Sequence, residues 1–126
     1  MHELAICQGL IAEIGRVSRA QRASQVHAVT VAVGALSGVD AGLLERAFSI
    51  ARAGTVAAQA RLTVDVLPAR VACMACGSEG EVPLNRLLCP SCGTWQVRLI
   101  GGEELVLTHV ELTRDAQASR PTALVG

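Results

Sequence analysis

The stretch Cys73-Met74-Ala75-Cys76-Gly77 and its repeat Cys89-Pro90-Ser91-Cys92-Gly93 decide how this chain is organised. Two C-x-x-C-G pairs at this separation supply four thiolates, the ligand set of a tetrahedral zinc site with Zn–S bonds of about 2.3 Å. The glycine after each second cysteine allows a positive φ, which lets backbone N–H groups turn toward the sulfurs. We therefore predict a zinc site formed by Cys73, Cys76, Cys89 and Cys92.

The same four cysteines have three other interpretations. Iron in a rubredoxin-like site is compatible with the spacing. Two disulfides would suit a secreted chain, but the N-terminus does not have the pattern of a signal peptide. A redox pair would need only one C-x-x-C, at the start of a helix. Four thiolates leave no open position for a substrate, so the zinc site is interpreted as structural.

The composition argues against several classes of protein. A chain of 126 residues can form one domain plus a small metal-held subdomain. Its net charge is zero and no basic stripe is present, which argues against a nucleic-acid-binding protein. No apolar run reaches about 18 residues, so we expect no membrane-spanning helix. Unpaired cysteines at metal-ligand spacing suit a reducing cytoplasm.

The first residues, Met1-His2-Glu3, can chelate a metal ion through nitrogen atoms. The Met1 amine, the deprotonated His2 amide and the His2 imidazole would form unstrained five- and six-membered rings in one plane. This geometry suits Ni(II) or Cu(II) and leaves one position open for a carboxylate, a water or a group from a partner. An open position would let the ion be passed on. The alternative is that His2 is an ordinary solvated terminal residue.

Hydrophobic periodicity predicts the main elements. Apolar residues at helical spacing predict two helices, at 4–21 and 40–53. Alternation predicts three main strands, at 26–33, 60–67 and 104–112. Because aromatic residues make up only 2% of the chain, we expect these elements to enclose an aliphatic core.

The zinc module, residues 70–100, is then an insertion between the second and third main strands, and we expect those two strands to pair. Short strands are expected inside it, at 81–84 and 95–99. Trp95 is expected to cover the sulfurs or to pack on the main domain. The main domain would comprise residues 1–69 and 101–113, and the tail 114–126 is expected to be disordered.

Four further residues can be given roles from their positions. Cys7 lies on the apolar stripe of the first helix and is interpreted as a core residue. His27 and His109 have no spaced partners and are interpreted as surface or structural residues rather than ligands. Asp40 is interpreted as the N-cap of the second helix, with a carboxylate near the N-terminal metal site as the alternative.

Several motifs together resemble a known family. They occur in one order over residues 1–112: the Met1-His2-Glu3-Leu4 start, the Gly34-Ala35-Leu36-Ser37-Gly38-Val39 turn, Gly54-Thr55, the two C-x-x-C-G pairs, and Gly101-Gly102-Glu103-Glu104-Leu105. This set resembles the HypA/HybF hydrogenase nickel-insertion proteins. The joint presence of the terminal M-H-E and the G-A-L-S-G turn makes the resemblance specific.

The resemblance implies a cytoplasmic nickel metallochaperone, not an enzyme, that loads [NiFe] hydrogenase and in some organisms urease. It implies partnership with the nickel-binding GTPase HypB and the hydrogenase large-subunit precursor. From the charge and the apolar runs described above, we expect no nucleic-acid or membrane partner. Nickel would bind at His2, with the Met1 amine and Glu3 as associated positions, and zinc at the four cysteines. The implied fold is α+β, a small α/β domain with two helices on a three-stranded sheet and an inserted zinc-ribbon-like subdomain. A homodimer formed by helix swapping is conceivable.

One departure and two rival functions also follow from the residues. Residues 71–100 contain no histidine, so zinc ligands cannot be exchanged for histidine within the module. The main rival is a zinc-ribbon module that binds protein or nucleic acid without carrying metal; zero net charge and the lack of stacking aromatics other than Trp95 argue against it. An enzyme finds no support, because no Ser/His/Asp set, phosphate loop or open zinc position is evident.

Overall fold

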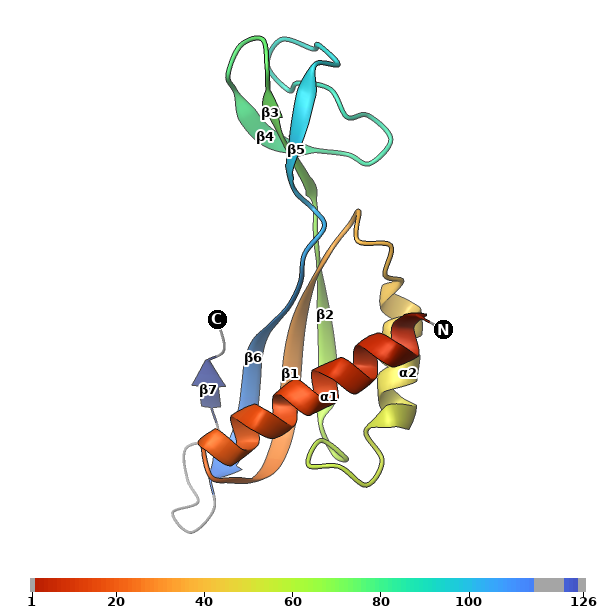
Figure 1. Ribbon diagram of the computed structural model, residues 1–126, viewed down its shortest axis with the longest axis vertical. Coiled ribbons are helices and arrows are strands. Elements are labelled where there is room, and N and C mark those ends of the chain that lie inside the picture. Colours follow the sequence, from red (N-terminus) through yellow and green to blue (C-terminus); the bar gives the residue numbers. More distant parts are fainter. Residues whose placement is uncertain (1, 115–121, 125–126) are drawn as a thin grey trace. The chain divides into compact units, whose positions relative to one another are not determined.

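The computed structural model describes residues 2–114 and 122–124 of the chain. Its elements, shown in Figure 1, are α1 (His2–Ala20), β1 (Ala23–Gly34), α2 (Ala41–Ala51), β2 (Arg61–Leu67), β3 (Ala69–Cys73), β4 (Glu79–Val82), β5 (Val97–Gly101), β6 (Leu105–Arg114) and β7 (Thr122–Leu124). The expected α+β class, with two helices and a four-cysteine subdomain, is confirmed.

The chain divides into two compact units. Unit 1 holds the residues up to Val31, then Asp40–Asp65, and the residues from Val106 onward. Unit 2 holds Ala32–Val39 and Val66–Leu105. The turn that follows β1 therefore groups with the cysteine-bearing unit, although 30 or more residues separate it from the cysteines in the sequence.

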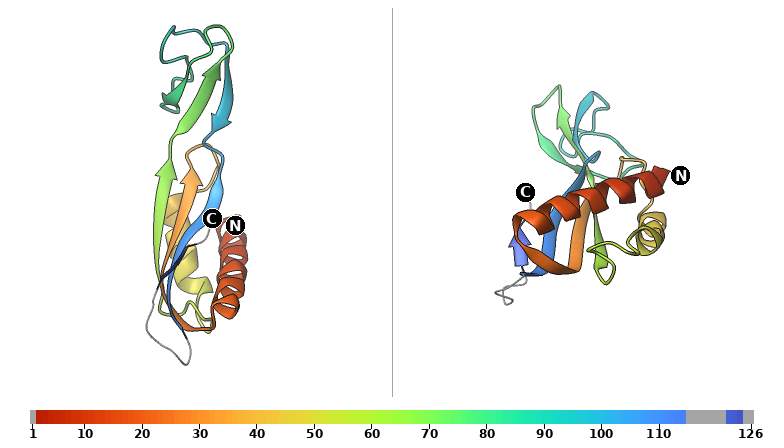
Figure 2. Two further views of the ribbon diagram at one scale, coloured as in Figure 1. Left: turned by 90° about the vertical axis from the view of Figure 1, so that its left-hand side faces the viewer. Right: turned by 60° about the horizontal axis from the view of Figure 1, so that its bottom comes forward.

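The main sheet has the strand order β2-β1-β6-β7. Figure 2 shows β1 lying between β2 and β6. The predicted pairing of the two strands that flank the zinc module is therefore wrong. The physical reason lies in β1, whose side chains Val26, Val29, Val31 and Val33 are at most 1% exposed. A strand so deeply buried gains most from a central position in the sheet.

The fourth strand, β7, was not predicted from the sequence. It pairs antiparallel with β6, with Thr122 opposite Glu111 and Leu124 opposite His109. The expected disordered tail, 114–126, thus contains one residue of β6 and three residues of β7. The rest of that tail lies outside the described residues.

The core of unit 1 is aliphatic apart from one phenylalanine, as expected. Helices α1 and α2 contact each other, and α1 crosses in front of the main sheet in Figure 1. Cys7 is fully buried, as predicted, and its Sγ donates to the carbonyl oxygen of Leu44 at 3.4 Å. Each large apolar side chain buried here contributes about 1.5–3 kcal/mol to stability. The largest are Ile14, Val26, Val29, Val31, Leu44, Phe48, Val110 and Leu112.

Unit 2 contains a second sheet, of order β4-β3-β5. The central strand β3 was not predicted. Pro68 interrupts the strand pattern that precedes it, but the chain resumes pairing directly afterwards, at Ala69. The two outer strands were predicted, with bounds two residues away from those observed. The core of this unit consists of Ala69, Val71 and Val82, packed against Leu36, Val97 and Leu99.

Two glycines, Gly34 and Gly102, allow the backbone to cross closely where the turn after β1 begins. A Cβ on Gly34 would lie 2.2 Å from the carbonyl carbon and oxygen of Gly102, so only glycine fits this crossing of two backbones. Leu36 then enters the core of unit 2, and its N–H donates to the Gly102 oxygen at 2.6 Å. The motif therefore closes the base of the cysteine-bearing unit.

No helix in the described part of the chain is both long and apolar enough to cross a membrane.

Candidate metal centres

The four predicted zinc ligands come together at one place in unit 2. Their Sγ atoms all lie within 4.8 Å of one another. The Cys73–Cys92 and Cys76–Cys89 sulfur pairs are 3.7 and 3.6 Å apart. A regular tetrahedron with metal–sulfur bonds of about 2.3 Å has sulfur–sulfur edges of about 3.8 Å, so the cluster is the right size for one ion. All four cysteines are free in the structure, which favours a metal site over two disulfides.

Both cysteine pairs adopt the same turn. Gly77 and Gly93 have φ values of 80° and 78°, and each donates its N–H to the carbonyl of the first cysteine in its pair. The N–H groups of Ala75 and Cys76 point at the Cys73 sulfur, at 3.3 and 3.2 Å. The second pair repeats this arrangement around the Cys89 sulfur, with Ser91 and Cys92 both at 3.3 Å. The predicted glycine conformation and the N–H groups directed at sulfur are confirmed.

These hydrogen bonds prepare the site for an ion. Hydrogen bonds from the side chain and backbone of Ser78, and others with neighbouring sulfurs, lower the pKa of Cys76 to about 6. The Cys92 backbone N–H lowers the pKa of Cys89. The Thr94 backbone N–H acts in the same direction on Cys92, but loss of hydration and the adjacent sulfurs outweigh it and raise that pKa to about 11. Four thiolates cannot ionise together so close to one another, so a bound cation is what would stabilise the fully deprotonated set.

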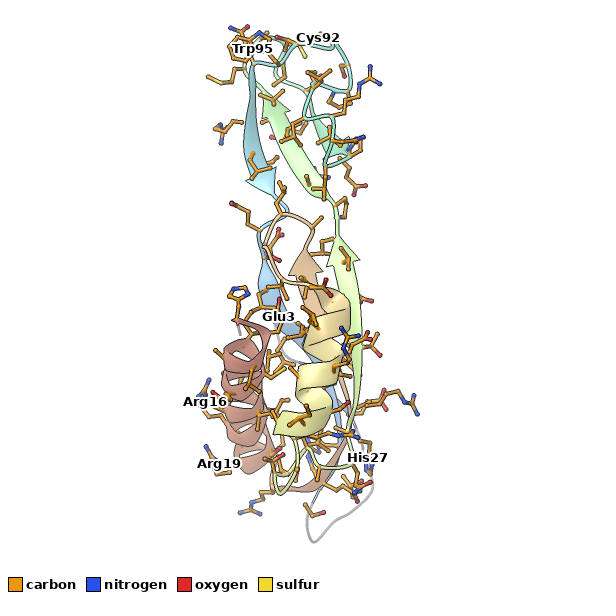
Figure 3. All side chains as sticks on the ribbon, turned by 90° about the vertical axis from the view of Figure 1, so that its right-hand side faces the viewer. Glu3, Arg16, Arg19, His27, Cys92 and Trp95 are labelled. Atoms are coloured by element: carbon orange, nitrogen blue, oxygen red, sulfur yellow. The ribbon has the colours of Figure 1, made fainter. Side chains whose placement is uncertain are left out.

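The cysteine cluster is partly exposed to solvent. Cys73 and Cys89 are buried, whereas Cys76 and Cys92 are exposed. Figure 3 shows Cys92 and Trp95 close to one end of unit 2. Trp95 is 75% exposed, so little of its indole ring is buried within unit 2.

The N-terminal residues predicted to bind nickel lie at the start of α1. His2 is the first residue of the helix and its side chain is 60% exposed. Its Nδ1 lies 3.7 Å from Glu3 Oε2, and the Glu3 side chain is only 13% exposed. Met1 lies outside the described residues. Two of the three predicted positions are therefore adjacent in the fold.

Glu3 is held by the start of the second helix. The Asp40 backbone N–H donates to Glu3 Oε2 at 3.1 Å, and Figure 3 shows Glu3 between the first turns of the two helices. This hydrogen bond is the leading cause of a lowered pKa of Glu3, with its own backbone N–H next. The Asp40 carboxylate accepts from Leu43 N at 3.0 Å, which confirms the predicted N-cap. Sequence reasoning missed the Asp40 N–H, because a backbone donor leaves no signal in residue type.

The other two histidines lie elsewhere. His27 Nε2 forms a hydrogen bond with Thr113 Oγ1, and His109 Nε2 lies 3.7 Å from Glu111 Oε2. Among residues 2–114 and 122–124, the four cysteines are the one group of three or more His, Cys, Asp or Glu side chains placed to hold a metal ion. Any N-terminal metal site would therefore depend on backbone nitrogens as well as side chains.

Comparison with known proteins agrees with these centres. Residues 1–112 match the family model described as hydrogenase/urease nickel incorporation, metallochaperone, hypA. The hydrogenase maturation factor HypA of Nitrosospira multiformis is 43% identical over 112 residues, which cover 89% of this chain and 97% of that protein. HypA of Aquifex aeolicus is 39% identical over 115 residues, covering 91% and 100%.

Two solved structures have the same fold. The solution structure of the nickel metallochaperone HypA from Helicobacter pylori has a TM-score of 0.68 at 23% identity, with 90% of this chain and 98% of that chain covered. A solution structure titled HypA protein has a TM-score of 0.69 at 25% identity, covering 91% and 98%. The family match favours metal delivery over the alternative of a zinc-ribbon interaction module. The chain belongs to the HypA family of nickel-incorporation metallochaperones, which act in hydrogenase maturation.

Proposed function

We propose that this metallochaperone carries Ni(II) on its first two residues, through the Met1 amine and the amide and imidazole nitrogens of His2. Glu3 is the associated carboxylate. The observation that carries the proposal is the position of His2: it begins α1, its imidazole is exposed, and Nδ1 faces the Glu3 carboxylate at 3.7 Å. In a chelate that also uses the His2 amide, Nδ1 is the nitrogen that closes a six-membered ring.

The start of a helix suits this chelate for two reasons. The first N–H groups of a helix have no intrahelical acceptor, so loss of the His2 amide proton breaks no helix hydrogen bond. The positive end of the helix dipole opposes a cation, but the charge of Glu3 offsets it. Glu3 is kept in place by the Asp40 N–H, so its carboxylate needs little ordering when nickel arrives.

For the four cysteines we propose a structural zinc ion. The cluster has the size and the thiolate ligands for a tetrahedral site, and four protein ligands leave no position for a substrate. Iron is the alternative with the same geometry, and elemental analysis of protein purified without added metal separates the two. The proposed functional domains are residues 1–69 with 101–113 for nickel and residues 70–100 for zinc.

The proposed partners follow from the family's place in hydrogenase maturation. They are a nickel-binding GTPase of the HypB type, the hydrogenase large-subunit precursor and, as a second client, urease. We place the protein in the cytoplasm and assign it no catalytic step, since delivery requires only ligand exchange at the open nickel position.

Nickel titration by calorimetry tests the N-terminal site. The chain with its native N-terminus should bind one more nickel ion than either His2→Ala or a chain whose Met1 amine is acetylated. His27→Ala is the matched control, because it removes an exposed histidine outside the site and should leave the stoichiometry unchanged. Equal stoichiometry in all four proteins would exclude the site. Acidification should weaken binding, because nickel displaces protons from its ligands.

A further inference from the structure

The C-terminal strand β7 covers only part of the edge of the main sheet. In the order β2-β1-β6-β7, β6 would be the edge strand if β7 were absent. The three residues of β7 pair with His109, Val110 and Glu111. The first half of β6, residues 105–108, has no paired strand on this side within the described part of the chain.

The strand β7 lies outside the residues that match the family model. The family match ends at residue 112, and β7 is formed by Thr122–Leu124. The three residues of β7 therefore lie outside the part of the chain that the family model matches.

The uncovered part of β6 has the properties of a strand that pairs with other chains. Leu105 and Val106 are 39% and 42% exposed. Apolar side chains beside free backbone N–H and C=O groups are a template for strand addition. Charged residues that would block it are absent from 105–110.

The sequence of β6 is also complementary to itself. Glu104 precedes the strand and Arg114 ends it. In an antiparallel pair of two copies centred on His109, Glu104 of each copy would stand opposite Arg114 of the other. Leu107 would face Glu111, so no like charges would meet. A two-fold pair of this kind uses the same surface on both copies.

Because β7 belongs to the same chain as β6, it competes for the β6 edge at a higher effective concentration than a second copy does. The end of β6 is fixed, since the Arg114 guanidinium donates to Gln21 Oε1 at 2.6 Å and Ser24 Oγ donates to the Thr113 oxygen at 3.4 Å. A strand joined to this fixed end by a short connection has an effective concentration in the millimolar range. Pairing over three residues is nevertheless weak, so another strand can displace β7 from β6.

We propose that the outer edge of β6 is a surface for pairing with a second copy of this chain, and that Thr122–Leu124 occupies it in cis and keeps the chain monomeric. This role is independent of nickel binding. A chain ending at Arg114 exposes the whole edge of β6 and dimerises through it.

Sedimentation velocity at about 0.1 mM, below the millimolar effective concentration, tests the proposal. The full chain should be monomeric and the chain ending at Arg114 dimeric. In the full chain, Ala123→Pro should also cause dimerisation, because proline fixes φ at about −65°, whereas an antiparallel strand needs a φ of about −140°. Ala118→Pro is the matched control outside β7 and should remain monomeric. A full chain that is dimeric overturns the proposal. So does a truncated chain that is monomeric although circular dichroism shows it to be folded. If the truncated chain does not fold, the oligomeric state of Ala123→Pro alone tests the proposal.

A second pair of variants identifies the edge that is used. In the truncated chain, or in Ala123→Pro if the truncated chain does not fold, Val106→Lys places a charge on the β6 edge and should restore the monomer. Val66→Lys does the same on β2, the opposite edge strand, where Val66 is 58% exposed, and should leave the dimer intact. The reverse result would place the interface on β2 and overturn the assignment to β6.

Discussion

Glu3 and Asp40 are joined by a hydrogen bond of 3.1 Å between a carboxylate oxygen and a backbone N–H, although 37 positions separate them in the sequence. The bond ties the first turn of α1 to the N-cap of α2. The same Glu3 oxygen lies 3.7 Å from His2 Nδ1. The geometry of the proposed nickel site thus depends on how the two helices pack.

Glu3→Gln should change the pH dependence of stability. The folded-state pKa of Glu3 is lowered, first by the Asp40 N–H, so the carboxylate stabilises the fold above its unfolded pKa of about 4.3. That contribution is lost as pH falls through the folded-state pKa. The free energy of unfolding, measured with urea between neutral and acidic pH, should therefore differ between wild type and Glu3→Gln at neutral pH and converge in acid. Glu45→Gln on α2 is the control, and a Glu3 difference that does not depend on pH would contradict the role of the charge.

Asp40→Ala should cost about 1 kcal/mol of stability, because the α2 N-cap at Leu43 N is lost. Asp40→Asn keeps an acceptor oxygen and should cost only a few tenths of a kcal/mol. Denaturant unfolding followed by circular dichroism measures both. Equal losses in the two variants would mean that the charge, and not the cap, stabilises this position.

Removal of the bound metal should expose one cysteine to alkylation ahead of the others. Cys76 is exposed and its pKa is lowered to about 6, so it is mostly thiolate at neutral pH. Cys92 is also exposed, but its pKa is raised to about 11. Brief iodoacetamide treatment of chelator-treated protein, followed by peptide mass spectrometry, should find Cys76 modified first. Cys7 should stay unmodified with or without metal, and equal labelling of Cys76 and Cys92 would contradict the expected order.

Gly34→Ala should destabilise the protein by at least about 3 kcal/mol, because its Cβ would meet the Gly102 backbone at 2.2 Å and neither chain can move aside. Gly9→Ala is the matched control. A Cβ there meets nothing within 4 Å, and alanine in a helix is favoured over glycine by about 1 kcal/mol. The two substitutions should therefore shift the unfolding midpoint in opposite directions. A mild effect at Gly34 would mean that the crossing of the two backbones can relax.

Local features were predicted well because neighbouring residues determine them. The two C-x-x-C-G turns, their positive-φ glycines and the N-cap at Asp40 each involve only a few consecutive residues. The helices and main strands were also found, since their apolar residues repeat with the helix or strand period. Iron or zinc at the four cysteines, and nickel at the N-terminus, remain predictions that need metal analysis.

The features that were missed all join distant parts of the chain. The pairing partners of β2 and β6 could not be predicted, because both depend on which strand is buried deepest. Leu36 could not be assigned to the core of unit 2 from a turn with little pattern.

The sequence by itself determined which residues can bind metal, because four sulfurs at fixed spacing and an imidazole next to an amine have this chemistry in any fold. Tertiary structure alone decided that the Asp40 N–H holds Glu3 and that β7 lies on the edge of β6. Each of these contacts uses at least one backbone group of a kind that every residue type but proline carries, so residue types alone cannot reveal them.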